Sequence, residues 1–442
     1  MRKLSVLLLG LMAAVAPAAA QTSSALPSFL LRANPADAPF IAARHNLTIV
    51  NQVTDASGVT MYLVTPVVDN PGLATELNGD LAVMAFERNH VVGIPESIRP
   101  RLMQSTAAIL EALPDRTIVP YYGRSVWRGY ANQPAAVLIN TPAVHALPVT
   151  GGGVVAIIDT GIDVNHPALV GAFVPGYDFV RQQATVTSDL AGVSQSTAAI
   201  LEAQVVGEPF RAALVNQSTA AILEQSTAAI LEASGVPAAF GHGTMVAGLV
   251  RLVAPTARIM PLTAFAPDGS GDVFNVVRAI YYAVDHGANV INMSFSLADW
   301  SAELVRAVNY ANEHDVICVA SAGNNGEETL VFPSAFRHVV GVGSSNNLDL
   351  RSTFSNFGNG LVYLAAPGES LITPFPAGRY AAVSGTSFSA ALVSGAAALI
   401  EQVKPGIEPT NAQEALSCAK RIGQDMGSGR LDLLSALLRA LK

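Results

Sequence analysis

Three short segments of this 442-residue chain hold residue types that act together in nucleophilic catalysis. Asp159 ends the apolar run VVAIID, His242 stands between two glycines in GHGTMVAG, and Ser387 precedes a long apolar stretch in SGTSFSAALVSG. A carboxylate, an imidazole and a hydroxyl form a proton relay when a fold brings them together. A helix starting at the serine also offers backbone N–H groups to an oxyanion. These residue types are therefore candidates for a catalytic site at one edge of the sheet, although Asp159 could instead cap a turn.

The elements around these segments predict a doubly wound α/β fold. Apolar runs with little polar alternation indicate strands that are buried on both faces. Helical patterns at 276–284 and 304–308 separate some of them, which favours a mostly parallel sheet flanked by helices. Ligands of such sheets bind beyond the carboxyl ends of the strands. The predicted strands cover residues 154–159, 259–263, 290–294, 316–321 and 339–343.

A smaller α+β unit is predicted before this sheet. Residues 28–94 show a β-α-β-β-α-β order of the ferredoxin-like kind, and prolines interrupt the stretch that follows. We therefore expect a linker at 95–125 and a large domain at 126–442. The predicted elements of the small unit are strands at 28–32, 48–53, 59–64 and 81–87, with helices at 38–46 and 73–77.

The chain resembles the subtilisin-like serine proteases, or subtilases. The motifs DTGID at 159–163, GHGT at 241–244 and GTS at 385–387 occur in the Asp, His, Ser order typical of that family. SAGNNG at 321–326 resembles its oxyanion segment, and GSGRLDLLSAL at 427–437 resembles its last helix. The resemblance implies a serine endopeptidase that cleaves polypeptides through an acyl-enzyme intermediate.

The resemblance also implies roles for individual residues. Asp159, His242 and Ser387 would form the catalytic triad, and the Asn324 amide would stabilise the oxyanion. The stretch Ser294, Phe295, Ser296 would align the substrate, with Ser296 standing where the family usually has glycine. The loop that binds calcium in many secreted relatives is missing after GTMVAGLVRLV, so we expect no strong metal site there and no cofactor.

The N-terminus predicts export. Residues 1–20 have a basic start, an apolar run and small residues before Gln21, the order of a secretory signal peptide, although an uncleaved anchor has similar features. The family resemblance then implies that residues 21–94 are a propeptide that inhibits the enzyme within the same chain, with an unrelated accessory domain as the alternative. We therefore expect a secreted or periplasmic zymogen with no membrane span after signal removal.

Other functions are less well supported. A net charge of −8 without a Lys/Arg-rich run argues against nucleic acid as a partner. The glycines at 151–153 precede a strand, whereas dinucleotide-binding glycines follow one. The two cysteines, Cys318 and Cys418, stand in apolar surroundings and are predicted to be buried thiols. The main alternative is a catalytically silent subtilase-fold interaction protein with a cleft blocked by its insert or its propeptide.

The octapeptide QSTAAILE is repeated and offers no catalytic group. It occurs at 104–111, 195–202, 217–224 and 225–232, so three copies fall in an insert at about 190–235 of the large domain. Surface loops tolerate such insertions at small entropic cost.

Deleting residues 195–232 should therefore leave folding intact. We expect soluble protein with an unchanged cooperative thermal transition, measured by circular dichroism. Loss of soluble protein would instead mean that the insert contributes to the core.

Overall fold

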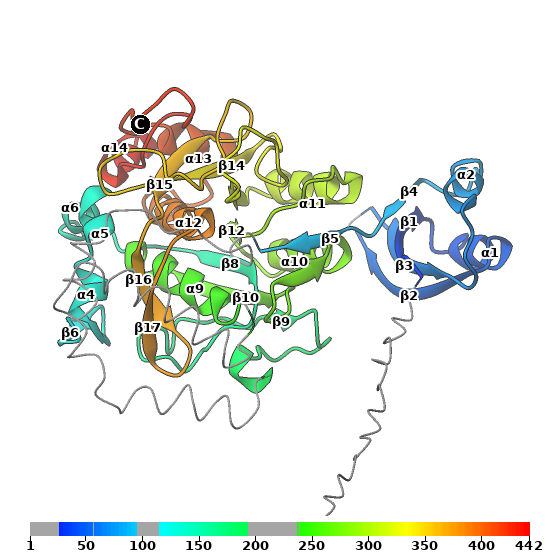
Figure 1. The fold of residues 1–442 in the computed structure, drawn as a ribbon, viewed down its shortest axis with the longest axis horizontal. Coiled ribbons are helices and arrows are strands. Elements are labelled where there is room, and N and C mark those ends of the chain that lie inside the picture. Colours follow the sequence, from blue (N-terminus) through cyan, green and yellow to red (C-terminus); the bar gives the residue numbers. More distant parts are fainter. Residues whose placement is uncertain (1–25, 56, 95–114, 193–236, 238) are drawn as a thin grey trace, which may run out of the picture.

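A parallel sheet of seven strands forms the centre of the molecule (Figure 1). The computed structural model describes residues 26–55, 57–94, 115–192, 237 and 239–442. The strand order is β15-β14-β13-β12-β8-β10-β9, and every neighbouring pair is parallel. The five predicted strands and the fold class are confirmed; β9 and β15 are additional. The strands are β8 (Val154–Asp159), β9 (Tyr177–Asp178), β10 (Arg258–Thr263), β12 (Val290–Met293), β13 (Ile317–Ser321), β14 (Val339–Ser345) and β15 (Leu364–Pro367).

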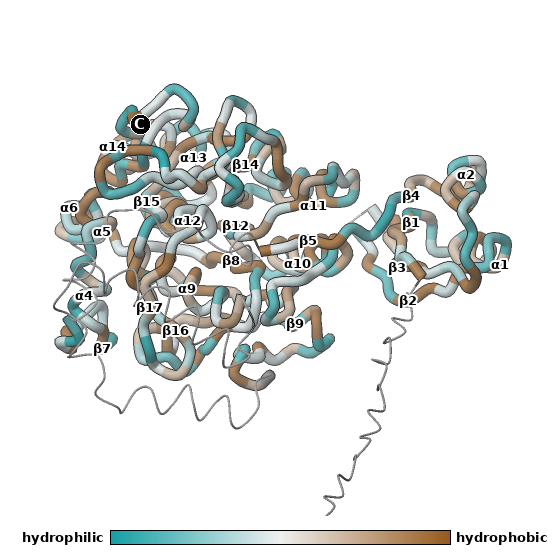
Figure 2. Tube along the Cα trace, viewed as in Figure 1, coloured by the Kyte–Doolittle hydropathy of each residue, from teal (hydrophilic) through white to brown (hydrophobic). Residues whose placement is uncertain are grey.

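Helices cover both faces of the sheet. Val155 and Ile157 of β8 pack in one hydrophobic cluster with α9 (His242–Val253) and α12 (Thr386–Val403). Ala156 and Ile158 point to the other face and join the cluster of α10 (Val273–Asp285) and α11 (Ala302–Glu313). This alternation follows from the two-residue period of a strand. Figure 2 accordingly shows hydrophobic residues along the central strands.

The chain direction across the sheet reverses beside β8. The chain passes from β8 to β9 and β10 on one side, then crosses to β12, β13, β14 and β15 on the other. Such a switch point opens a crevice at the carboxyl ends of the two central strands. Asp159 ends β8 and Ser294 follows β12, so both lie at this edge.

Helix α12 is the longest of the described helices. Among the described helices it alone is long and apolar enough to cross a membrane, yet nearly all of it is buried in the core. Gly395 lets it approach α9 closely, because a Cβ there would lie 2.7 Å from Cβ of Val253. This contact places the end of α9 against the middle of α12. Helices α13 (Pro409–Leu416) and α14 (Leu433–Ala440) pack at the end of the chain.

The N-terminal unit has the predicted β-α-β-β-α-β order. Its antiparallel sheet runs β2-β3-β1-β4, and the last strand begins at Ala85 rather than at the predicted residue 81. The chain instead turns at residues 81–82. The Asp80 side chain accepts a hydrogen bond there from the backbone N–H of Ala82. The elements are β1 (Phe29–Ala33), α1 (Ala38–Arg44), β2 (Leu47–Thr54), β3 (Thr60–Pro66), α2 (Leu73–Asn78) and β4 (Ala85–Arg88).

Strand β5 (Val91–Gly93) connects this unit to the main body (Figure 1). It pairs antiparallel with β11 (Ser270–Asp272) at the edge of the large domain. The next residue, Ile94, is buried and donates its backbone N–H to the carbonyl of Gly269. The small unit is therefore docked on the large one through backbone pairing.

A hairpin of β6 (Ile118–Tyr121) and β7 (Arg124–Trp127) crosses the predicted boundary between linker and large domain. The Tyr121 hydroxyl donates a hydrogen bond of 2.5 Å to the carbonyl of Leu252 on α9, so the hairpin packs with the large domain. Three short helices follow it, and a second hairpin lies near α9. These elements are α4 (Arg128–Ala131), α5 (Pro134–Leu138), α6 (Thr141–His145), β16 (Leu371–Phe375) and β17 (Arg379–Val383).

The two cysteines differ in burial. Cys318 is buried in β13 as expected, but Cys418 is partly exposed just after α13, so the prediction of two buried thiols was wrong for Cys418. Helix α13 ends at Leu416, and Cys418 lies in the partly exposed segment after it, where local apolar composition does not ensure burial. The predicted signal peptide at 1–20 and all four QSTAAILE copies lie outside the described residues.

Gly395→Ala should destabilise the large domain. The added methyl overlaps Val253, so we expect the free energy of unfolding to fall by about 1–3 kcal/mol, despite the better helix propensity of alanine. Chemical denaturation measures this loss. Gly79→Ala is the control, because its neighbours lie at an ordinary 3.5 Å. Equal stabilities of the two variants would contradict a tight α9–α12 crossing.

Candidate active site

Asp159 lies fully buried at the carboxyl end of the central strand β8. Its carboxylate accepts a hydrogen bond of 2.7 Å from the backbone N–H of Thr160. Parallel neighbours on both sides, β10 and β12, hold the strand end in place. A rigid scaffold therefore orients this carboxylate.

His242 begins helix α9 and faces Asp159 directly. Its Nδ1 lies 2.8 and 3.0 Å from the two carboxylate oxygens, and both side chains are buried. An ionised carboxylate only accepts hydrogen bonds, so Nδ1 carries a proton and donates it. In the neutral ring, Nε2 then holds the lone pair and is the basic nitrogen. Gly241 allows this turn into the helix, because its φ is +79° and a Cβ would lie 2.6 Å from Pro376.

Ser387 lies in the first turn of helix α12, which packs against α9. The ring of Phe388, the following residue, lies 5.3 Å from the His242 ring between centroids. The Ser387 hydroxyl donates to the backbone carbonyl of Ser294 at 3.3 Å, and the Ser294 hydroxyl donates to the carbonyl of Ser387 at 3.1 Å. These two bonds tie the helix start to the end of β12.

Asn324 is anchored to the residue before the serine. Its Oδ1 accepts hydrogen bonds from the backbone N–H and the hydroxyl of Thr386, at 3.0 and 2.8 Å. The same hydroxyl accepts from the N–H of Gly323 at 3.1 Å. Because Oδ1 faces these donors, the orientation of the carboxamide and of its NH₂ group is defined relative to the start of α12.

The stretch from Ser294 to Ser296 pairs with an extended segment. The backbone N–H of Ser296 donates to the carbonyl of Gly93 at 3.0 Å, and its carbonyl accepts from the N–H of Gly93. Phe295 is buried and packs against Phe265, with ring centroids 5.2 Å apart. Strand β5 therefore lies between this stretch and β11, as a peptide does when it adds a strand to a sheet edge.

Sequence reasoning missed three polar residues of this region. Thr160 and Thr386 were within reach of it, because they stand inside the DTG and GTS motifs. Asp189 carried no local signal, yet its buried side chain accepts hydrogen bonds from Thr160, Gly161 and Gly241. Only the fold brings Asp189 beside the segments that carry Asp159 and His242.

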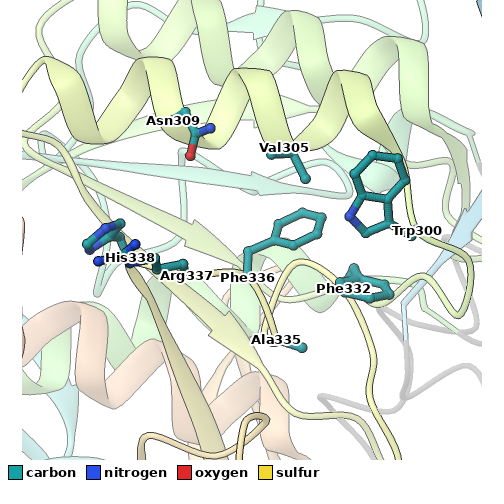
Figure 3. A pocket seen from close by; sticks show the side chains of 8 residues that line it. All are labelled: Trp300, Val305, Asn309, Phe332, Ala335, Phe336, Arg337 and His338. Atoms are coloured by element: carbon teal, nitrogen blue, oxygen red, sulfur yellow. The ribbon is translucent and has the colours of Figure 1, made fainter.

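A cavity of about 480 Å³ lies apart from these residues, between α11 and the segment after β13 (Figure 3). Apolar side chains such as Trp300 and Phe336 dominate its lining, and it contains no carboxylate. Among the described residues, no group of three or more His, Cys, Asp or Glu side chains is arranged to hold a metal ion.

The structure thus combines a doubly wound α/β fold with a buried Asp–His pair at one sheet edge. The chain belongs to the subtilase family, whose model matches residues 150–431. It is a serine-type endopeptidase, and enzymes of this family act on polypeptides.

Known relatives agree with this assignment. The chain is 29% identical to the thermophilic serine proteinase of Bacillus sp. (strain AK1) over 361 residues, covering 77% of this chain and 79% of that protein. It is 31% identical to thermitase of Thermoactinomyces vulgaris over 262 residues, covering 59% and 79%. Fervidolysin from Fervidobacterium pennivorans shares the fold, with a TM-score of 0.67 at 20% identity over 93% of this chain and 61% of that one.

Proposed function

We propose that Asp159, His242 and Ser387 form the catalytic triad of an exported endopeptidase made as a zymogen. The observation that carries this proposal is the buried contact of His242 Nδ1 with both oxygens of Asp159. That contact leaves Nε2 as the base, on a helix packed against the one that begins beside Ser387.

The proposed reaction follows from these positions. Ser387 Oγ attacks the substrate carbonyl while His242 Nε2 takes its proton. His242 then gives the proton to the leaving amine, and Asp159 stabilises the imidazolium throughout. Water later cleaves the acyl-enzyme by the same proton transfers in reverse order.

Asn324 and the start of α12 are the proposed oxyanion site. The anchored carboxamide of Asn324 and the backbone N–H of Ser387 would donate to the tetrahedral oxyanion. Loss of one such side-chain donor in a subtilisin costs about 10²–10³ in kcat. Ser294, Phe295 and Ser296 would align the substrate on one edge, with β11 on the other, because β5 pairs with both segments.

Ser387→Ala should abolish both peptide cleavage and labelling by a fluorophosphonate, since the hydroxyl is the proposed nucleophile. Gel fluorescence of the exported protein measures the labelling, after an added protease has removed the N-terminal unit from every variant. Ser389→Ala, a buried serine two residues further along α12, is the control and should keep the label. Failure to label the folded wild-type chain would favour the catalytically silent interaction protein instead.

The N-terminal unit is the proposed intramolecular inhibitor. Its β5 occupies the space between Ser296 and β11, where a substrate would bind. Glu87 of β4 accepts hydrogen bonds from the Ser301 hydroxyl and the Ala302 N–H, at 2.6 and 2.8 Å, at the N-terminus of α11. A carboxylate there also interacts favourably with the helix dipole.

A buried ion pair adds to this docking. Arg32 of β1 contacts Glu303 of α11 at 2.7 Å and also binds Asp55 of its own unit. Burial of the pair makes the contact sensitive to loss of either partner.

We propose a signal peptide at 1–20, a propeptide at 21–94, a linker at 95–125 and a catalytic domain at 126–442, acting after export to the periplasm or the exterior.

Glu87→Gln should weaken inhibition. Hydrogen bonds to a charged group contribute about 1.5–3 kcal/mol, so we expect the cleaved N-terminal unit to dissociate at about tenfold higher concentration or more. The onset of peptidase activity on diluting the full, self-processed chain measures this. Asp69→Asn, an exposed carboxylate of the same unit, is the control. Identical onset in both variants would contradict the proposed role of Glu87.

A further inference from the structure

Asp189 bridges the two chain segments that carry the Asp159–His242 pair. It lies in the 3-10 turn η2 (Asp189–Gly192), and its side chain is buried. Its Oδ1 accepts the backbone N–H of Gly161 at 2.8 Å, two residues after Asp159. Its Oδ2 accepts the N–H of Gly241 at 2.7 Å, directly before His242. One carboxylate thus holds the strand end and the helix start together.

Thr160 extends this bridge to the other side of His242. Its hydroxyl donates to Asp189 Oδ2 at 2.9 Å and accepts the backbone N–H of Gly243 at 3.1 Å. The residues on both sides of His242 are therefore bonded to the same network. A shift of Asp189 would move the imidazole relative to the Asp159 carboxylate.

The glycine at position 161 allows the close contact with Asp189. A Cβ on Gly161 would lie 2.6 Å from Asp189 Oδ1, so only glycine permits this approach. Burial, reinforced by the negative charge of Asp159, raises the pKa of Asp189 to about 6, and its hydrogen bonds oppose that rise. Strongly perturbed buried carboxylates of this kind concentrate at functional sites.

We propose that Asp189 is a positioning residue that sets the geometry of the Asp159–His242 hydrogen bond through Gly161, Gly241 and Thr160. It touches neither the substrate nor the attacking hydroxyl in this role. The inference rests on the proposed triad, because a positioning effect on His242 matters only if His242 is the base.

Asp189→Asn tests this role with little change of shape. One acceptor becomes an NH₂ group facing an N–H donor, so one side of the bridge is lost. We expect kcat to fall on the order of 10- to 100-fold, as for a small misplacement of catalytic groups, with KM nearly unchanged. The downfield proton resonance of His242 Nδ1–H should also shift, which a merely structural role would not cause.

Controls separate this inference from general destabilisation. Asp178→Asn removes another fully buried carboxylate, one that binds Arg181 at the edge strand β9, and should leave kcat and the resonance unchanged. Thr160→Val removes the hydroxyl that links Asp189 to the backbone N–H of Gly243. Combined with Asp189→Asn, it should cost less than the product of the two single effects, because both act through one network.

The outcomes are distinct. All variants are made in the full chain, and rates are measured after release of the N-terminal unit, whose rate of release is recorded as well. Normal kcat and an unshifted resonance in Asp189→Asn, with Ser387→Ala inactive, would overturn this inference alone. Activity that survives Ser387→Ala would overturn the proposed triad. Failure of Asp189→Asn and Asp189→Ala to fold would overturn the inference by assigning Asp189 to fold stability.

Discussion

The hydrogen bond between the Asp159 carboxylate and His242 Nδ1 is the contact on which the rest of the site depends. It joins a strand end to a helix start, 83 positions apart in the chain and fully withdrawn from solvent. Burial makes the contact strong, but an unpaired carboxylate there would be costly. The fold therefore has to hold β8 and α9 in one relative position, which the central sheet and the close α9–α12 crossing both do.

The same edge of the large domain serves two kinds of binding. Backbone groups of Ser296 and β11 pair with the extended strand β5, and the N-terminus of α11 binds the Glu87 carboxylate. The N-terminal unit uses both features at once, through β5 and Glu87. Under the proposed function, inhibition and substrate binding would use the same backbone donors and acceptors of Ser296 and β11.

Much of this structure could be predicted from the sequence. Apolar runs such as VVAIID and VVGVG mark strands buried on both faces, because β-branched residues without polar alternation fit few other settings. The element order of the N-terminal unit followed from turn residues such as those at 55–58. The sequence pattern predicted the wrong structure where the local composition was ambiguous. Residues 81–84 are apolar but lie in a turn region before the strand, and the proline-containing segment at 118–121 forms one strand of a hairpin.

The sequence by itself determined the family, the fold class and the residue types offered for catalysis, because these depend on short motifs and on the periodicity of neighbouring residues. Tertiary structure alone decided which distant groups meet. Arg32 contacts Glu303 across 271 positions, and Asp189 contacts Gly241 across 52. No local pattern encodes such pairs, since each contact arises only when the sheet order and helix packing bring separate segments together.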